Sequence, residues 1–290
     1  MFTRKADPFT LQFVAVFLIV ASAIALAYVA YYQQQLAVVQ ASTHSELQSM
    51  ARLLAQDVGR WRNERLGDGE VLRRNRAALL RLDASVSGQV GNGVVNAELR
   101  YWLHSYLDAF DYTAVLVLSR SGGTVMALGT AHRISPHTTS VIEHTRITGA
   151  PALTALQRDD DGAIYLDLVV PVPLVGESWH IDTVVLRVDP SRYLIPLLHG
   201  WPRRSYSGEN LLFEEQRDSL VLQLPSRLAP MMELPQVFES GNAGKVWAHA
   251  FDNRFSGEGS DQRPGSQVFG ALARVDGCNW VLLSKIDVDE

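Results

Sequence analysis

The N-terminal part of the chain contains one long apolar stretch, Phe9–Tyr32, which runs for 24 residues without a charged side chain. An α-helix rises about 1.5 Å per residue, so this stretch would be about 36 Å long and would cross the roughly 30 Å hydrocarbon core of a bilayer with some tilt. Arg4 and Lys5 precede it, and the next Lys or Arg is Arg52. This asymmetry places residues 1–8 in the cytoplasm and everything after residue 32 outside it. We predict an uncleaved membrane anchor over residues 9–32; the alternative, a cleaved signal peptide, normally has an apolar region of only about 7–15 residues.

The residues after the anchor have the composition of a folded protein. The chain has 290 residues, of which 47% are hydrophobic and 20% charged, and this balance is typical of globular domains. The length outside the membrane suffices for one large or two ordinary domains. A net charge of −5 gives no basic footprint, so we expect no nucleic-acid partner. Cys278 is the only cysteine and cannot form an internal disulfide.

A helical pattern follows the anchor directly. Over residues 33–65, apolar side chains recur at steps of three and four, which predicts one helix that leaves the membrane as a stalk. The glycines of Gly67-Asp68-Gly69 are expected to end it. The apolar stripe fits packing on the chain's own domain, and near the membrane it also fits a second copy of the chain. We therefore expect a homodimer with a seam at Leu47, Met50 and Leu54.

The remaining pattern indicates an α+β fold. Two further helices are expected at Glu70–Leu82 and Ala97–Phe110, followed by a hairpin and a short helix at His137–Thr148. About five antiparallel strands then occur on each side of a short helix that begins near Ser191. The expected strands are Thr113–Leu118, Thr124–Leu128, Pro151–Gln157, Ala163–Val172, His180–Val188, Leu211–Glu215, Leu220–Leu224, Lys245–Phe251, Gln267–Val275 and Trp280–Ile286.

Three stretches carry a resemblance to a known family. They are QRDDDGAIYLDLVVPV (157–172), LRVDPSRYLIPLLHGWPRRSYSGENLLFEE (186–215) and NWVLLSKIDVDE (279–290). With these stretches the chain resembles the double-Cache extracytoplasmic sensor domain, in which two PAS-like modules ride on one long N-terminal helix. The resemblance implies a membrane-distal module at 66–190, a connecting helix at 191–204 and a membrane-proximal module at 205–290. The polar insertion Asn253–Ser266 departs from the family pattern, which has a tight turn there.

The resemblance also implies a function. It points to the sensor region of a bacterial receptor in the inner membrane, with the distal module binding a small molecule outside the cytoplasm and the proximal module transmitting the signal. In this family a second transmembrane helix and a histidine kinase or cyclic-dinucleotide enzyme follow, and this sequence contains neither. The alternative is a membrane-tethered periplasmic interaction or structural module that has no small ligand.

The sequence lacks the common catalytic and metal-binding patterns. It contains no G-x-S-x-G elbow and no phosphate-binding loop with Lys and Ser/Thr. His132, His137 and His144 are five and seven residues apart, whereas two ligands on one helical face would be four apart. The acidic turn 159–161 lacks the alternating ligands and closing glutamate of a calcium loop. We expect this segment not to be an enzyme, and to have no catalytic residues, no metal site and no cofactor.

The candidate ligand site lies between the expected first sheet and the segments that cross it. A charged side chain in the middle of an apolar strand, Asp167, needs a partner if it is buried. Arg146 is the expected partner, either directly or as the second of two charges that bracket the amino and carboxylate ends of a zwitterionic ligand. There are two alternatives. Asp167 faces solvent on a two-faced antiparallel sheet, or Trp102 and Tyr106 belong to the core of their helix. The residues expected to line the site are Trp102, Tyr106, His144, Arg146, Tyr165 and Asp167.

Overall fold

The structure of the chain is a computed structural model. The structure describes residues 8–86, 94–130, 133–159, 161–173, 179–201, 205–217, 219–224, 227–228, 236–239 and 268–287. Several sequence predictions lie outside these residues. They concern Arg4, Lys5, His132, the strand Lys245–Phe251 and the insertion Asn253–Ser266.

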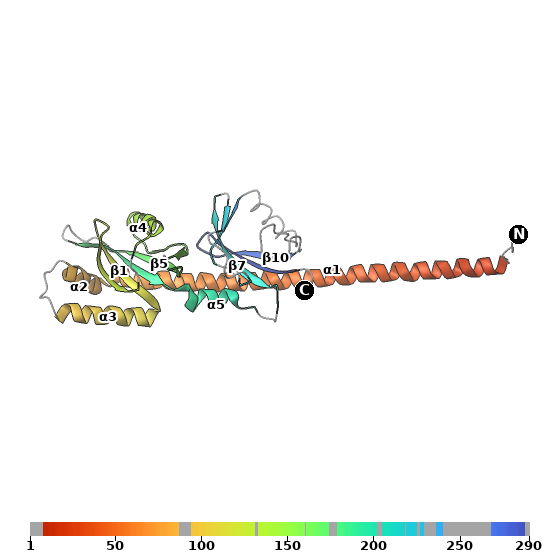
Figure 1. The fold of residues 1–290 in the computed structure, drawn as a ribbon, viewed down its shortest axis with the longest axis horizontal. Coiled ribbons are helices and arrows are strands. Elements are labelled where there is room, and N and C mark those ends of the chain that lie inside the picture. The colour runs from red at the N-terminus through yellow and green to blue at the C-terminus, as the bar shows by residue number, and fades with distance from the viewer. Residues whose placement is uncertain are drawn as a thin grey trace.

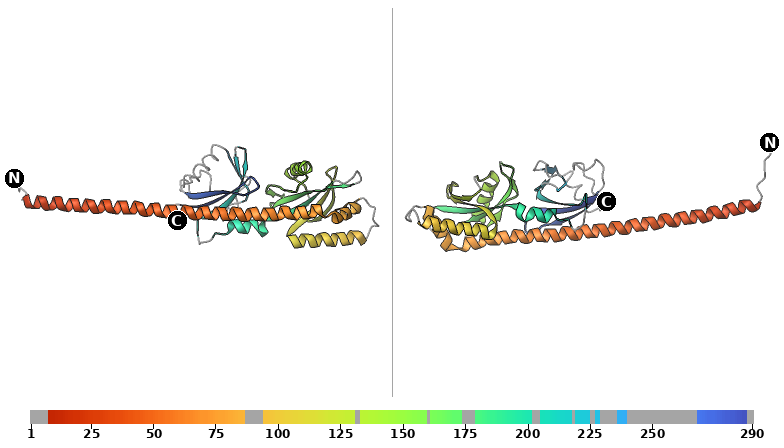
Figure 2. Two further views of the ribbon diagram at one scale, coloured as in Figure 1. Left: turned by 180° about the vertical axis from the view of Figure 1, so that it is seen from behind. Right: turned by 60° about the horizontal axis from the view of Figure 1, so that its bottom comes forward.

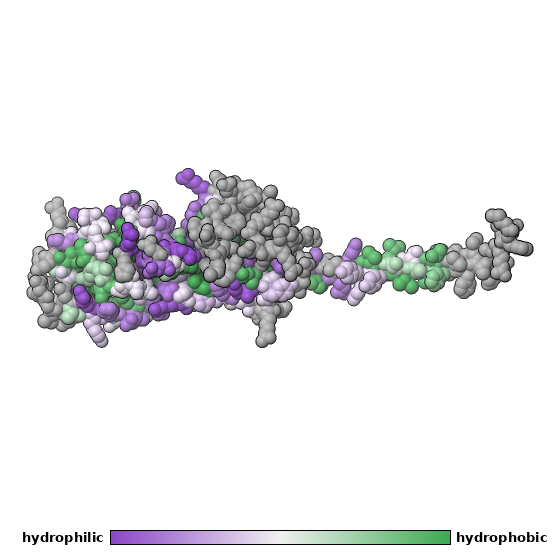
Figure 3. All heavy atoms as spheres, viewed as in Figure 1, coloured by the Kyte–Doolittle hydropathy of each residue, from purple (hydrophilic) through white to green (hydrophobic). Residues whose placement is uncertain are grey.

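One helix, α1 (Pro8–Arg74), organises the whole molecule. Its first part projects beyond the rest of the protein, and both sheets lie along its second part (Figure 1). The projecting part exposes large apolar side chains such as Phe17, Ile19 and Leu26 (Figure 3). Within the described residues, α1 is the one helix long and apolar enough to cross a membrane.

The prediction that Gly67 and Gly69 end this helix is wrong. Helix α1 continues to Arg74, and a short break at Asn75 separates it from α2 (Arg76–Val86). Gly69 is buried where α1 crosses the first sheet, and a Cβ atom there would lie 3.0 Å from the Pro151 Cβ atom and 3.2 Å from Val170 Cγ2. The glycine therefore allows close approach of helix and sheet instead of breaking the helix.

The first sheet lies between helices on its two faces. Helices α1, α2 and α3 (Val94–Phe110) cover one face, and α4 (Pro136–Thr148) covers the other (Figure 1). All its pairings are antiparallel, in the order β2-β1-β6-β5-β3, with β4 also paired to β5. Its strands are β1 (Tyr112–Ser119), β2 (Thr124–Gly129), β3 (Ala152–Leu153), β4 (Gln157–Arg158), β5 (Ile164–Pro171) and β6 (Ile181–Val188).

The second sheet is also antiparallel and packs on α1 nearer to its N-terminal end. A 3-10 turn η1 (Pro190–Arg192) and helix α5 (Leu194–His199) connect the two sheets, where one short helix was expected. Strand β9 lies outside the stretches that the sequence predicted to be strands. The strand order is β10-β11-β7-β8-β9, formed by β7 (Glu209–Gln216), β8 (Ser219–Leu222), β9 (Gln236–Glu239), β10 (Val268–Arg274) and β11 (Trp280–Asp287).

A continuous apolar core follows α1 beneath both sheets. Ala51, Ala55 and Val58 are buried within it, together with side chains from β10 and β11. Leu47 is only 3% exposed and Leu54 packs against the same core. The expected dimer seam at Leu47, Met50 and Leu54 is therefore not a free surface, because Leu47 and Leu54 already pack within the chain.

Candidate functional site

The candidate site lies on the face of the first sheet that α4 covers. Along β5, Leu166, Leu168 and Val170 pack toward α1, and the alternate residues face α4, as expected for a strand. Asp167 is one of those alternate residues and is 0% exposed. The charged side chain in mid-strand is thus buried under α4 and does not face solvent.

Arg187 on β6 pairs with Asp167. The two residues are direct neighbours in the antiparallel register of β5 and β6. Arg187 Nε donates to Asp167 Oδ1 at 2.9 Å and Arg187 Nη2 donates to Oδ2 at 3.2 Å, and the Arg187 side chain is 5% exposed. Such a two-pronged contact is the strongest geometry for an arginine and a carboxylate. It compensates the buried charge that the sequence pattern left unexplained.

The prediction that Arg146 pairs with Asp167 is wrong. Arg146, on α4, donates from Nε to Asp182 Oδ2 at 2.7 Å. The sequence contained a signal for the true partner, because Arg187 interrupts an apolar strand as Asp167 does. Only the strand register shows that the two residues are opposite each other.

Three further groups surround the Arg187 guanidinium. The Arg187 guanidinium lies 3.7 Å from the centre of the Tyr165 ring, a cation–π contact, and donates to the Arg133 carbonyl oxygen at 3.1 Å. Burial raises the pKa of the Tyr165 hydroxyl, which therefore stays protonated at neutral pH. Asp159 lies 3.9 Å from Arg187 Nη1.

A polar network ties this ion pair to α4 and to the short strands. Thr138, on α4, donates from Oγ1 to Asp167 Oδ2 at 2.9 Å. Gln157 Nε2 donates to Thr138 Oγ1 at 3.1 Å and to Thr154 Oγ1 at 3.0 Å, and Ser135 donates to Gln157 Oε1. Ser135 is also the N-cap of α4, since its Oγ accepts from the Thr138 backbone N–H. A rearrangement at Asp167 would therefore reach the first turn of α4.

The structure brings together only part of the predicted site. Tyr165 and Asp167 lie in the cluster, and Arg146 belongs to the neighbouring ion pair on α4. His144 is exposed on the outer side of α4. Trp102 and Tyr106 lie on α3, across the sheet, where their ring centres are 5.7 Å apart.

Tyr106 belongs to the helix packing on that opposite face. Its hydroxyl donates to the Asp68 carbonyl oxygen at 3.2 Å, and its ring stacks on that of Tyr112 at 6.2 Å. Trp102 packs against the same core. These two residues therefore do not share one pocket with Asp167.

The cluster is a buried group of polar and charged side chains. Hydroxyl, amide, carboxylate, guanidinium and phenol groups converge between a sheet and a single covering helix. The described residues contain no group of three or more His, Cys, Asp or Glu side chains that could hold a metal ion.

Comparison with known proteins identifies the fold. No protein-family model matches the sequence, and no curated protein matches it significantly. The sensory domain of the Campylobacter jejuni chemoreceptor Tlp3 aligns over 88% of this chain and 97% of its own, with a TM-score of 0.58 and 11% sequence identity. The ligand-binding domain of the Pseudomonas aeruginosa PAO1 amino acid chemoreceptor PctB, in complex with L-Gln, aligns over 84% and 90%, with a TM-score of 0.55 and 14% identity. That of Pseudomonas fluorescens CtaA, in complex with L-isoleucine, aligns over 88% and 96%, with a TM-score of 0.54 and 13% identity.

These similar structures are ligand-binding or sensory domains of bacterial chemoreceptors. The resemblance to Cache-type sensor domains that the sequence indicated is therefore confirmed at the level of the fold.

Proposed function

We propose that this chain is the extracytoplasmic sensor region of a bacterial transmembrane receptor in the inner membrane. Its two sheets form two PAS-like modules on α1. The module built on the first sheet binds a small polar molecule under α4. The module built on the second sheet passes the signal across the membrane to an output domain, a kinase or a cyclic-dinucleotide enzyme.

The buried cluster around Asp167 and Arg187 is the observation that carries this proposal. Charges inside a protein cost free energy even when paired, and apolar residues of similar volume are often as stable or more stable. Leu116, Val169 and Val185 are buried apolar residues of the same sheet face. Stability alone therefore does not explain charged residues at this position, whereas recognition of a polar ligand does.

The position of the cluster also supports a route for the signal. A ligand under α4 competes with the Thr138–Asp167 hydrogen bond and so shifts α4 against the sheet. The opposite face of the same sheet packs on α1, and β11 ends beside α1 (Figure 2). A ligand shifts such an equilibrium only by its differential affinity for the two states, and about 1–3 kcal/mol is typical of allosteric coupling.

We propose a homodimer formed through a part of α1 that the sheets leave uncovered. Val38, Val39 and Leu53 are each about 60% exposed on this helix. Single cysteines at these positions, with Cys278 replaced, should crosslink between two copies of the full chain in membranes. A cysteine at the buried Ala51 should not. Equal crosslinking at all four positions would contradict this interface.

Thermal unfolding of the full chain in detergent tests ligand binding. The compounds are L-amino acids, small carboxylates and small amines, since the similar chemoreceptor domains were solved with amino acids. We expect at least one compound to raise the Tm of the wild type. Gln157→Met removes the amide that bridges Thr138 and Thr154. In this variant the compound concentration needed for the same rise in Tm should be at least tenfold higher. Gln216→Met, on an exposed position of the second sheet, should leave it unchanged.

A second candidate function is a membrane-tethered interaction module without a small ligand. One observation favours it: Asp167 and Arg187 satisfy each other, so the fold needs no ligand to compensate its buried charges. If no compound changes the Tm, or if Gln157→Met and Gln216→Met respond alike, this second function replaces the first.

A further inference from the structure

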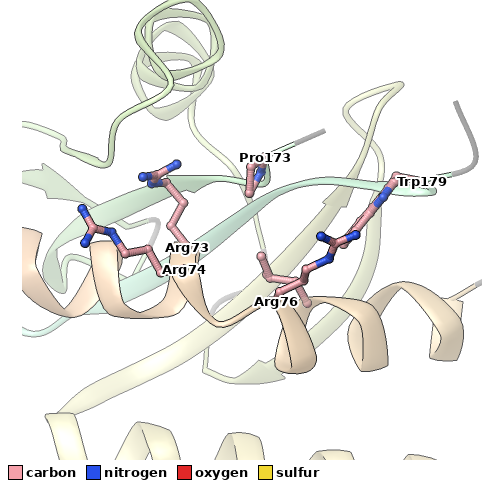
Figure 4. Close-up of a pocket in the computed structure, with 6 residues that line it drawn as sticks. Arg73, Arg74, Arg76, Pro173 and Trp179 are labelled. Atoms are coloured by element: carbon pink, nitrogen blue, oxygen red, sulfur yellow. The ribbon is translucent and has the colours of Figure 1, made fainter. Parts of the chain in front are cut away.

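A hollow of about 250 Å³ lies where α1 ends and α2 begins (Figure 4). It is separate from the cluster under α4, because it is formed by helices on the other face of the first sheet and by Pro173 and Trp179, which lie between β5 and β6 in the chain. Its lining combines arginines with apolar side chains. The lining residues are Arg73, Arg74, Arg76, Leu79, Pro173 and Trp179.

The hollow carries an excess of positive charge. Arg73 donates from Nε and Nη2 to the two Glu70 carboxylate oxygens at 2.6 and 2.7 Å, and Arg74 donates from Nε to Glu70 Oε1 at 2.5 Å. One carboxylate is thus shared by two guanidinium groups. The hydrogen bonds from Arg73 lower the pKa of Glu70 to about 2, so the carboxylate stays ionised at neutral pH.

Arg76 adds a third positive charge. Its side chain is exposed and, within the part of the chain that the structure describes, forms no hydrogen bond or ion pair. Asp83, an acid on the same helix, does not neutralise it, because Asp83 accepts from the backbone N–H groups of His180 and Ile181 at 2.6 and 3.0 Å. The guanidinium of Arg76 is therefore available to an anion from outside the chain.

The walls of the hollow are apolar. Leu79 is 1% exposed and belongs to the core, and Trp179 is half-buried and packs against the same core. Figure 4 shows Arg73 and Arg74 at one end of the hollow and Arg76 with Trp179 at the other. An indole ring held in this way offers a flat surface on which another ring stacks.

We propose that this hollow binds a small aromatic carboxylate. Guanidinium groups bind a carboxylate through paired, charge-assisted hydrogen bonds, and the apolar wall of Leu79, Pro173 and Trp179 takes the ring. Pockets for drug-sized ligands have volumes of about 300–1000 Å³. The volume of this hollow therefore suits one ring with a short acidic group. This site does not rest on the proposed sensor function.

Calorimetric titration of the full chain in detergent with benzoate tests the proposal. Benzamide, which has the same ring without the charge, should bind at least tenfold more weakly than benzoate. Acetate, which has the charge without the ring, should do the same. Arg76→Gln should weaken benzoate binding at least tenfold. Arg81→Gln, which removes an exposed arginine of α2 outside the lining, should change it less than twofold.

The outcomes distinguish this site from the cluster under α4. Gln157→Met should leave benzoate binding unchanged, whatever its effect on other compounds. The proposal is overturned if benzoate does not bind, if benzamide or acetate binds as well as benzoate, or if Arg76→Gln and Arg81→Gln have the same affinity.

Discussion

Removing the Asp167 carboxylate should strongly destabilise the protein, because it leaves a buried arginine without its counterion. Asp167 is 0% exposed and the Arg187 side chain 5% exposed, so water does not take the place of the lost partner. Asp167→Asn has nearly the same shape and isolates the effect of the charge. The acceptor for the Thr138 hydroxyl is weakened by the same change.

The expected loss is about 3–5 kcal/mol in the free energy of unfolding, the range for breaking a buried ion pair by removing one partner. For a folded part of roughly 200 residues, each 1 kcal/mol corresponds to about 2–4 °C, so the Tm should fall by about 10 °C. Asp111→Asn is the matched control. Asp111 pairs with Arg192 at 2.9 Å, but the two side chains are 72% and 52% exposed, and such pairs contribute only about 0.2–1 kcal/mol.

Urea unfolding of the full chain in detergent, followed by tryptophan fluorescence, measures both losses. A double-mutant cycle with Arg187→Met separates the pair from its surroundings. The double variant should be about 2–3 kcal/mol more stable than the sum of the two single losses predicts. If Asp167→Asn costs no more than Asp111→Asn, or if the cycle shows no coupling, the buried ion pair is not formed in solution.

Three further predictions concern α1 and the topology. Gly67→Ala should raise the free energy of unfolding by about 0.5–1 kcal/mol, because Gly67 lies inside a helix with open space around it. Gly69→Ala should lower the free energy of unfolding by about 1–3 kcal/mol, because the added methyl group would press against the first sheet. If urea unfolding gives the same sign for both variants, this packing is contradicted. The ion pairs lower the pKa of Glu70 from 4.5 to about 2, so their stabilisation is present above pH 4.5 and is lost as the pH falls toward 2. The Tm difference between wild type and Glu70→Gln should therefore shrink between pH 7 and pH 2.5, and a constant difference in thermal scans would argue against these ion pairs. A reporter enzyme that works only outside the cytoplasm should be active when it is fused after Ile286. Activity of a reporter that works only in the cytoplasm, fused at the same position, would overturn the proposed orientation.

The sequence by itself determined the features that depend on local pattern. The apolar stretch Phe9–Tyr32 and the stripe that follows it indicated one helix leaving a membrane, and alternation along 163–172 indicated a strand with two different faces. All six strands of the first sheet, of which β3 and β4 share one expected strand, and four of the five of the second overlap stretches that were expected to be strands. The α+β class follows from the order of these elements, and the stretches 157–172, 186–215 and 279–290 carry the resemblance to a sensor domain.

Only the tertiary structure decided how distant residues meet. Gly69 favours a helix end by its local propensity, but the gain from packing α1 directly on β5 outweighs the roughly 1 kcal/mol that a glycine costs inside a helix. The partner of Asp167 depends on which residue of β6 lies opposite it, and a register is set by the whole sheet and not by neighbours along the chain. For the same reason the sequence did not predict the hollow lined by Arg76 and Trp179. These two residues are far apart in the chain and line one hollow only because α2 packs beside the start of β6.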